Sequence, residues 1–363
     1  MIRIIFAIVV MLHGLIHLMG FVKAFRLAGI KGLSMDITRP AGMLWLAVAL
    51  LFTASGVLVL IEYDPWWMTA AAAVVFSQLL VVLYWHDAKF GTIANVIVLC
   101  GAVIGFGIWS FNAGLRAELA RFAVPAAAEK RILTRDAAAG LPPAVRTWLE
   151  RSGAVGKEIA RSVSLKQKGM MRTAPDGKWM PVTADQRIIT GSPAFIWIAE
   201  VAAAPGIFLS ARDTYREGKG RMYIRALSLF PVADAGGPEI NQGALTRYLA
   251  ELVWVPSAAV NDYVRWEDAG PGAAKATMTW GGITASGVFT FDANGDMTGF
   301  RAHRYYDRKG GATLEEWIIR IEPGGYREFG GVRIPARFSV TWHLKNGDFT
   351  WYKMELSDIR YNE

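Results

Sequence analysis

The sequence contains one cysteine, Cys100, and only five histidines among its 363 residues. A single cysteine cannot form a disulfide within one chain, so cysteine usage does not indicate a redox compartment. Also absent are the GxSxG elbow, the Walker loop, the HExxH and CxxC motifs and the Rossmann glycine pattern. We therefore expect no cofactor and favour a non-enzymatic role, although acid–base chemistry by a carboxylate such as Asp213 or Glu251 stays open.

Charged residues are absent from four long segments near the N-terminus, at 4–22, 41–61, 66–85 and 92–113. Each segment has roughly 20 residues, enough for a helix to cross a hydrocarbon core of about 30 Å. Tryptophans lie near several of the segment ends, where an amphipathic ring prefers the headgroup level. Residues 1–112 are therefore predicted to form a bundle of four transmembrane helices.

The basic residues around these segments indicate an orientation. The loop at 23–40 carries four basic residues, whereas the turn at 62–65 carries none. The positive-inside rule then places the loop in the cytoplasm and the C-terminal domain outside, although basic residues after the fourth segment point the other way. We expect an extracytoplasmic C-terminal domain.

Two histidines interrupt the first apolar segment at a spacing of four residues, so His13 and His17 share one helix face. Other segments supply polar partners, including Gln78 and Asn95. The favoured interpretation is a bundle interior in which hydrogen bonds join these four side chains. The alternative is a metal, haem or proton-handling site, because an HxxxH pair can supply two ligands; which metal it would hold is unknown.

Beyond the apolar segments the sequence changes character. Residues 113–139 are rich in alanine and charge and are interpreted as a linker or stalk. From about residue 160 apolar residues alternate with polar ones, and Asn346-Gly347 is a strong hairpin signal. Residues 140–363 are therefore predicted to form a mainly antiparallel β domain with one or two packed helices.

The strand AFIWIAEV is apolar on both faces, and the segment NQGALTRYLAELVWVP has a helical apolar stripe. A sheet with two apolar faces must cover both, with helices, membrane or a hydrophobic ligand. A closed barrel, a sandwich and a half-barrel with helices in its concave face all fit this pattern.

The densest polar and aromatic cluster of the β domain is SARDTYREGKGRMYIR. In one interpretation, guanidinium groups hold an anionic head group at a cavity while the apolar sheet holds its tails. In the other, the cluster forms cross-strand ion pairs on a solvated face. With the predicted helix, the candidate ligand-binding residues are Arg212, Asp213, Tyr215, Arg247, Glu251 and Trp254.

The combination of HGLIHLMGFVKAF, WHDAKFGTIAN, QGALTRYLAELVWVP and GGVRIPARFSVTWHL resembles a family of uncharacterised bacterial membrane proteins. In that family a few N-terminal spans precede a β-rich domain. The β domain is also similar in pattern to the LolA-like lipoprotein carriers, open half-barrels that hold acyl chains, although no carrier-specific motif is present. The resemblance implies a multi-pass protein of the bacterial inner membrane.

We therefore expect a membrane-anchored protein whose β domain binds a lipid or another hydrophobic ligand at the cell envelope, with membrane lipids as partners. One alternative is a redox or metal-handling protein that uses His13 and His17. Another is a structural component that docks an envelope protein. Basic and acidic residues are interleaved, so nucleic acid is not an expected partner.

Overall fold

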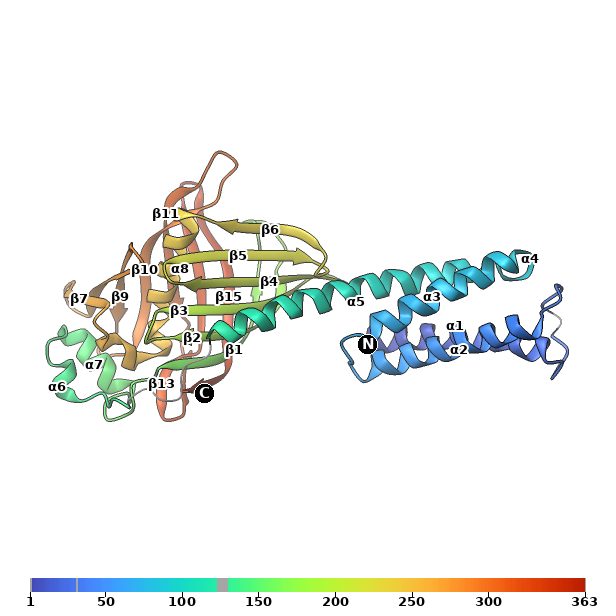
Figure 1. Cartoon of the computed structure of the whole chain (residues 1–363). Helices are drawn as coiled ribbons and strands as arrows, with labels where there is room; N and C mark the ends of the chain where they lie inside the picture. The colour runs from blue at the N-terminus through green and yellow to red at the C-terminus, as the bar shows by residue number, and fades with distance from the viewer. Residues whose placement is uncertain (1, 31, 123–129, 363) are drawn as a thin grey trace. The chain divides into compact units, whose positions relative to one another are not determined.

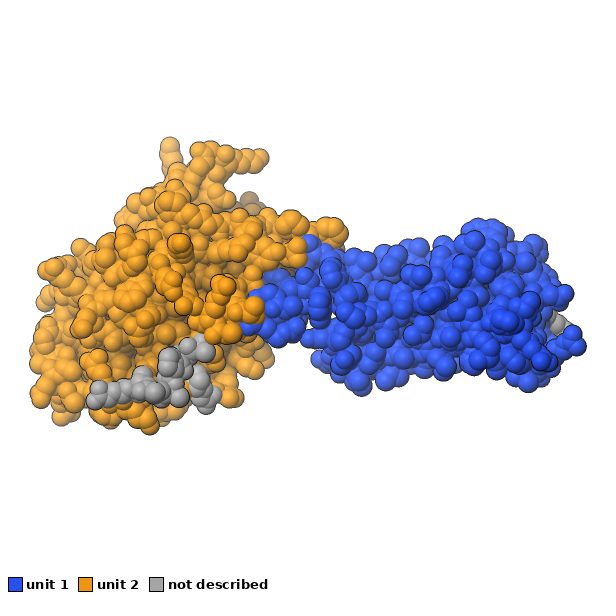
Figure 2. All heavy atoms as spheres, viewed as in Figure 1, with its two compact units in different colours: residues 1–116, 227–229 blue, residues 117–226, 230–363 orange. Residues whose placement is uncertain are grey.

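The computed structural model describes residues 2–30, 32–122 and 130–362. The chain divides into two compact units, shown in Figure 2. Unit 1 comprises residues 1–116 and 227–229, and unit 2 comprises residues 117–226 and 230–363.

Unit 1 is built from long apolar helices (Figure 1). Four of them are long and apolar enough to cross a membrane, and many of their leucine, isoleucine and valine side chains are exposed, as lipid contact requires. The four predicted apolar helices are thus confirmed, and they indicate a multi-pass membrane protein. The helices are α1 (Ile2–Ala24), α2 (Arg39–Leu60), α3 (Trp66–Leu83) and α5 (Gly91–Leu119), with the one-turn helix α4 (Trp85–Ala88) before α5.

Glycines allow α1 and α2 to pack closely. A Cβ atom at Gly14 would lie 2.8 Å from Cβ of Phe52 and 3.1 Å from the carbonyl oxygen of Ala49. At Gly20 the corresponding space is filled by the ring of Trp45. Lipid tails are as apolar as leucine, so close van der Waals contact of this kind is what holds membrane helices together.

The structure describes only part of the predicted stalk, residues 113–122 and 130–139. Helix α5 runs to Leu119 and the 3₁₀ turn η1 (Ala120–Phe122) follows, so the predicted start of the stalk at residue 113 falls within a helix. Residues 123–129 of the stalk lie outside the described residues. After them comes the one-turn helix α6 (Arg135–Ala138), where the hydroxyl of Thr134 accepts a hydrogen bond from the backbone N–H of Ala137.

Unit 2 contains a curved antiparallel sheet of 13 strands. Its helices are α7 (Pro143–Arg151), α8 (Pro238–Glu251) and the 3₁₀ turns η2 (Leu252–Trp254) and η3 (Pro256–Val260). The strands are β1 (Ser162–Met171), β2 (Met180–Ile189), β3 (Ala194–Ala204), β4 (Ile207–Arg216), β5 (Lys219–Ala226), β6 (Phe230–Gly236), β7 (Val264–Asp268), β8 (Ala273–Trp280), β9 (Ile283–Phe291), β10 (Met297–Tyr306), β11 (Thr313–Ile321), β14 (Arg337–Leu344) and β15 (Gly347–Tyr361). A separate hairpin pairs β12 (Tyr326–Phe329) with β13 (Val332–Pro335).

The sheet consists of two meanders joined by one strand. Its order is β6-β5-β4-β3-β2-β1-β15-β14-β11-β10-β9-β8-β7, so β15 links the meander that starts at β1 to the one that ends at β14. Helix α8 connects the two edge strands in sequence, and it contacts β4 and β5 of one meander and β8, β9 and β10 of the other. Figure 1 shows α8 within the curve of the sheet. The half-barrel with a helix in its concave face is confirmed.

The apolar stripe of α8 explains its position. The helix begins at Pro238, directly after Gly237, whose φ of 107° favours glycine. The predicted stripe is buried against the sheet at Leu245, Tyr248, Leu249 and Leu252. Burial of these four side chains is worth several kcal/mol, which fixes the helix inside the half-barrel.

Two sequence predictions in the strands are refined by the register. The hairpin between β14 and β15 is present, but its loop residues are Lys345 and Asn346, because Leu344 pairs with Gly347. On β3, Ile196 faces away from the concave side and is nevertheless buried, and η1 contacts this strand. The two-sided apolar pattern of β3 thus has a cover on its outer face as well.

Candidate functional site

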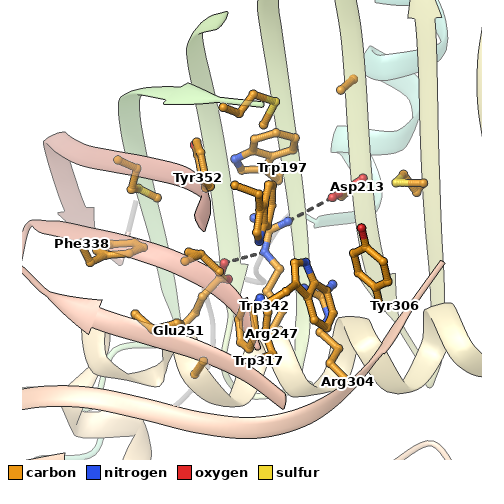
Figure 3. Close-up of a pocket in the computed structure, with 18 of the residues that line it drawn as sticks. Trp197, Asp213, Arg247, Glu251, Arg304, Tyr306, Trp317, Phe338, Trp342 and Tyr352 are labelled. Atoms are coloured by element: carbon orange, nitrogen blue, oxygen red, sulfur yellow. Dashed lines mark hydrogen bonds and ion pairs between the residues drawn. The ribbon is translucent and has the colours of Figure 1, made fainter. Parts of the chain in front are cut away.

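The concave side of the half-barrel holds a cavity of about 520 Å³ between α8 and the sheet (Figure 3). Strands of both meanders contribute to its wall. Aromatic and apolar side chains dominate, including Trp197, Met222, Trp317, Phe338, Trp342 and Phe349. This volume lies within the range of about 300–1,000 Å³ typical of small-molecule sites.

The two-residue period of the strands decides which side chains reach the cavity. On β4, Asp213 lines the cavity together with Ala211 and Leu209, which lie two and four residues before it. Arg212 has the opposite parity, and its Nε lies 2.8 Å from Oε2 of Glu118. Arg212 therefore does not belong to the cavity that the sequence pattern assigned it to.

Arg247 is the centre of the polar cluster at the cavity. Its Nη1 lies 3.1 Å from Oδ2 of Asp213, and its Nε lies 2.6 Å from Oε1 of Glu251, one turn further along α8 (Figure 3). Burial opposes its charge, but the two carboxylates outweigh that effect and raise the pKa of Arg247. Burial raises the pKa of Asp213 in turn, although Arg247 and Arg304 oppose the rise.

Two buried glutamines extend this cluster across the sheet. The Nε2 of Gln186 donates to Oε2 of Glu251 at 2.5 Å, and Nε2 of Gln167 donates to Oε1 of Gln186 at 2.8 Å. The indole N–H of Trp197 donates to Oε1 of Gln167, also at 2.8 Å. Each buried amide oxygen therefore has a donor, which a polar group in a low-dielectric interior requires.

The sequence prediction missed both glutamines, although a signal was present. Gln167 stands two residues after Leu165, and Gln186 stands between Ala184 and Ile188 in the same alternating set. All five side chains are buried. An amide in an inward-facing apolar series indicates a buried polar partner, and here that partner is the cluster on α8.

Arg304 is a second guanidinium that the sequence prediction missed. It lies on β10, lines the cavity and stacks on Trp317, with its Cζ 5.0 Å from the ring centroid. Within the described part of the chain it makes no hydrogen bond and no ion pair. Burial and the positive charge of Arg247 lower the pKa of Arg304 to about 10, so it stays protonated at neutral pH.

Of the six candidate ligand-binding residues, the structure brings four together at the cavity: Asp213, Arg247, Glu251 and Trp254. Arg212 and Tyr215 are not among its lining residues. Tyr215 shares the inward face of β4 with Asp213, but it is fully buried and stacks on Phe195 with ring centroids 6.3 Å apart. Burial raises the pKa of Tyr215 to about 12, so its hydroxyl stays neutral.

In unit 1 the structure also brings the four intramembrane candidates together. The Nε2 of His13 donates to Oδ1 of Asn95 at 2.9 Å, and Nδ2 of Asn95 donates to Oε1 of Gln78 at 3.0 Å. His17 donates from Nδ1 to the backbone carbonyl of His13, and its Nε2 lies 2.9 Å from the hydroxyl of Ser77. These bonds tie α1, α3 and α5 to one another through polar side chains.

The network contains two histidines, His13 and His17, as possible metal ligands. Among the residues that the structure describes, no three His, Cys, Asp or Glu side chains lie close enough together to hold a metal ion. Both ring nitrogens of His17 already face a carbonyl or a hydroxyl oxygen. The arrangement fits hydrogen-bonded packing of the helices.

Comparisons with known proteins match the chain to a family of unknown function. A family model named DUF6544, described as a family of unknown function, matches residues 131–354. No curated protein matches the chain. Among solved structures, the chain is similar to the crystal structure of a DUF1329 family protein from Desulfovibrio piger ATCC 29098, at 8% identity and a TM-score of 0.30. That match covers 60% of this chain and 92% of the other, and a likeness at this score supports no functional inference.

Proposed function

The chain belongs to the DUF6544 family, whose function is unknown, and we propose that it is a membrane-anchored protein that binds one lipid or other hydrophobic small molecule in its half-barrel. The observation that carries this proposal is the cavity of about 520 Å³ on the concave face, with an aromatic wall and a few buried charges. Apolar cavities with a small number of convergent polar groups are the usual form of small-molecule sites.

The cavity has a route to the surface. Thr173, Tyr305 and Asp307 contribute to its lining and are exposed. They lie just after β1 and at the end of β10, so the cavity reaches the surface near the ends of these strands.

The volume limits the size of the ligand. If a methylene group takes up as much space as a water molecule in the liquid, ~30 Å³, the cavity has room for roughly 17 such groups. This suits a single acyl chain with a compact head group. A two-chain phospholipid would leave one chain outside the cavity.

Filling the cavity is expected to remove the ligand. Met222 lines the cavity on β5, and Met222→Trp should reduce the bound ligand at least tenfold, because the indole takes its place. The full-length protein is purified in nanodiscs and extracted with organic solvent, and the extract is quantified by mass spectrometry. Wild type should yield one compound near equimolar amounts.

Leu314→Trp is the matched control, because Leu314 is 52% exposed on β11 and does not line the cavity. Wild type, Met222→Trp and Leu314→Trp carry the same lipid around their helices. A difference in extracted ligand between them therefore reports on the cavity. Equal yields of every compound from Met222→Trp and Leu314→Trp would refute the proposal.

The orientation is a further part of the proposal. We propose that the β domain lies on the extracytoplasmic side of a bacterial inner membrane, since the loop at 23–40 carries four basic residues. Alkaline phosphatase fused after residue 363 should then be active, and green fluorescent protein fused at the same site should be dark. The reverse pattern would place the domain in the cytoplasm.

A further inference from the structure

Of the two arginines Arg247 and Arg304 at the cavity, Arg247 forms ion pairs with described residues and Arg304 does not. Arg247 takes both nearby carboxylates, at 3.1 Å from Asp213 and 2.6 Å from Glu251. The other oxygen of Glu251 accepts from Gln186. Arg304, by contrast, makes neither a hydrogen bond nor an ion pair with any of the described residues. Its guanidinium instead lies over the face of the Trp317 ring.

The side chain of Arg304 is half-buried at the cavity. Partial removal of a cation from water is unfavourable unless an anion or several oxygens replace the lost solvent. A second donor beside Arg304 also lacks a partner in the described part of the chain. The indole N–H of Trp317 is buried and also has no acceptor among the described residues. The guanidinium of Arg304 and the indole N–H of Trp317 are thus two donors at the cavity without an acceptor among the described residues.

The fold holds Arg304 in place. On β10 it shares the inward face with Phe300 and Tyr306, and α8 passes beside it at Gly243. A Cβ atom at Gly243 would lie only 3.0 Å from Nε of Arg304. Glycine in a helix interior is less favourable than alanine, and here its missing side chain leaves room for the guanidinium.

We propose that the ligand of the cavity is an anionic amphiphile with one apolar chain, whose carboxylate or phosphate oxygens bind the guanidinium of Arg304. This inference rests on the proposed function and names the ligand class. The planar fork of an arginine can bind two oxygens of either oxyanion at once. The apolar chain then lies along the aromatic wall, of which Trp342 and Phe338 are part.

The pKa of Arg304 supports this assignment. Burial and Arg247 lower that pKa to about 10, although Asp213 and Glu251 oppose the fall, so the group is charged at neutral pH. An oxyanion beside it would reverse the imbalance and stabilise the charged form. The unpaired cation is thus prepared for a negative partner before the ligand arrives.

The test uses three probes with the same chain on the full-length protein: hexadecanoic acid, hexadecyl phosphate and 1-hexadecanol. Native mass spectrometry at neutral pH counts bound probe, and the amount retained by Met222→Trp is taken as background. For wild type we expect the acid or the phosphate to bind at least tenfold more tightly than the alcohol. The tighter of the two oxyanions identifies the source of the head group.

The variants locate this selectivity. Arg304→Met should bring all three probes to the level of the alcohol, whereas Arg304→Lys should keep part of the preference for the anions. Arg301→Met is the matched control, since Arg301 lies three residues earlier on the outward face of β10 and pairs with Glu316. If Arg304→Met does not fold, the proposal is tested by the selectivity of wild type for the anionic probes and by the partial loss of that selectivity in Arg304→Lys.

The outcomes separate the two proposals. If wild type binds the alcohol as tightly as both anions, and Met222→Trp loses all three probes, the anionic ligand class is wrong and the hydrophobic site stands. If no probe exceeds the background of Met222→Trp, the proposed function fails together with this inference. If anion selectivity survives in Arg304→Met, the head group binds elsewhere and the role of Arg304 is wrong.

Discussion

Replacing Arg247 with methionine is expected to destabilise the β domain by about 3 kcal/mol, because it leaves Asp213 and Glu251 without their shared cation. Breaking a buried pair by removing one partner usually lowers the free energy of unfolding by about 3–5 kcal/mol. We expect the lower end, since the side chain of Asp213 is still 28% exposed. Urea unfolding of the full-length protein, followed by tryptophan fluorescence, measures the loss.

The loss should depend on pH in a defined direction. Burial already raises the pKa of Asp213 above 3.8, against the pull of Arg247, and loss of Arg247 raises it further. A carboxyl whose folded-state pKa exceeds its unfolded value contributes stability below the unfolded value and loses that contribution as pH rises through the folded value. The destabilisation should therefore grow as pH rises above the ordinary pKa range of an aspartate.

A triple variant provides the control. Arg247→Met combined with Asp213→Asn and Glu251→Gln removes the uncompensated charges, so it should recover much of the lost stability and show little pH dependence. A neutral cluster of similar volume is often as stable as a buried ion pair. If the triple variant were as unstable as Arg247→Met alone, the packing of the arginine stem, and not its charge, would be the larger effect.

In unit 1, Gly14→Val is expected to lower the free energy of unfolding by about 1–3 kcal/mol through overpacking. The new side chain would start 2.8 Å from Cβ of Phe52 and 3.1 Å from the backbone of Ala49, atoms that cannot move aside by changing a rotamer. Helices α1 and α2 must then separate. Thermal unfolding of the detergent-solubilised protein reports the change.

Gly101→Val is the matched change on α5. There the new Cβ atom meets the far end of the Phe6 ring, which can rotate away. Its effect should be clearly smaller than that of Gly14→Val. Equal losses from the two variants would mean that helix propensity, and not the contact between α1 and α2, sets the stability.

The sequence was most informative where one local pattern decides the structure. Long uncharged segments predicted α1, α2, α3 and α5, and the apolar stripe through Leu245 and Leu249 predicted α8 and its buried face. Arg247 and Glu251 lie one turn apart on this helix and form an ion pair, as their spacing favours. These features depend on residues at most a few turns apart, and so they can be read from the chain itself.

The structure brings only part of the sequence-predicted cluster to the cavity, and the reason lies in strand geometry. Arg212 and Asp213 are neighbours in sequence but lie on opposite faces of β4, so a cluster of charges in the sequence splits in the fold. Arg304 was detectable, because it alternates with Phe300 and Tyr306 on β10. That Arg304 lacks an acid partner could not be predicted, since it depends on where α8 crosses the sheet.

The pairing of β15 with β1 has a consequence for how the domain is made. Tyr361 pairs with Val163, so the two meanders become one sheet only when the last strand of the domain has been synthesised. Until then each arm has an open edge and an uncovered apolar face, both of which favour aggregation. Contacts this distant in sequence also slow folding. The nascent domain is therefore most exposed to aggregation before translation reaches β15.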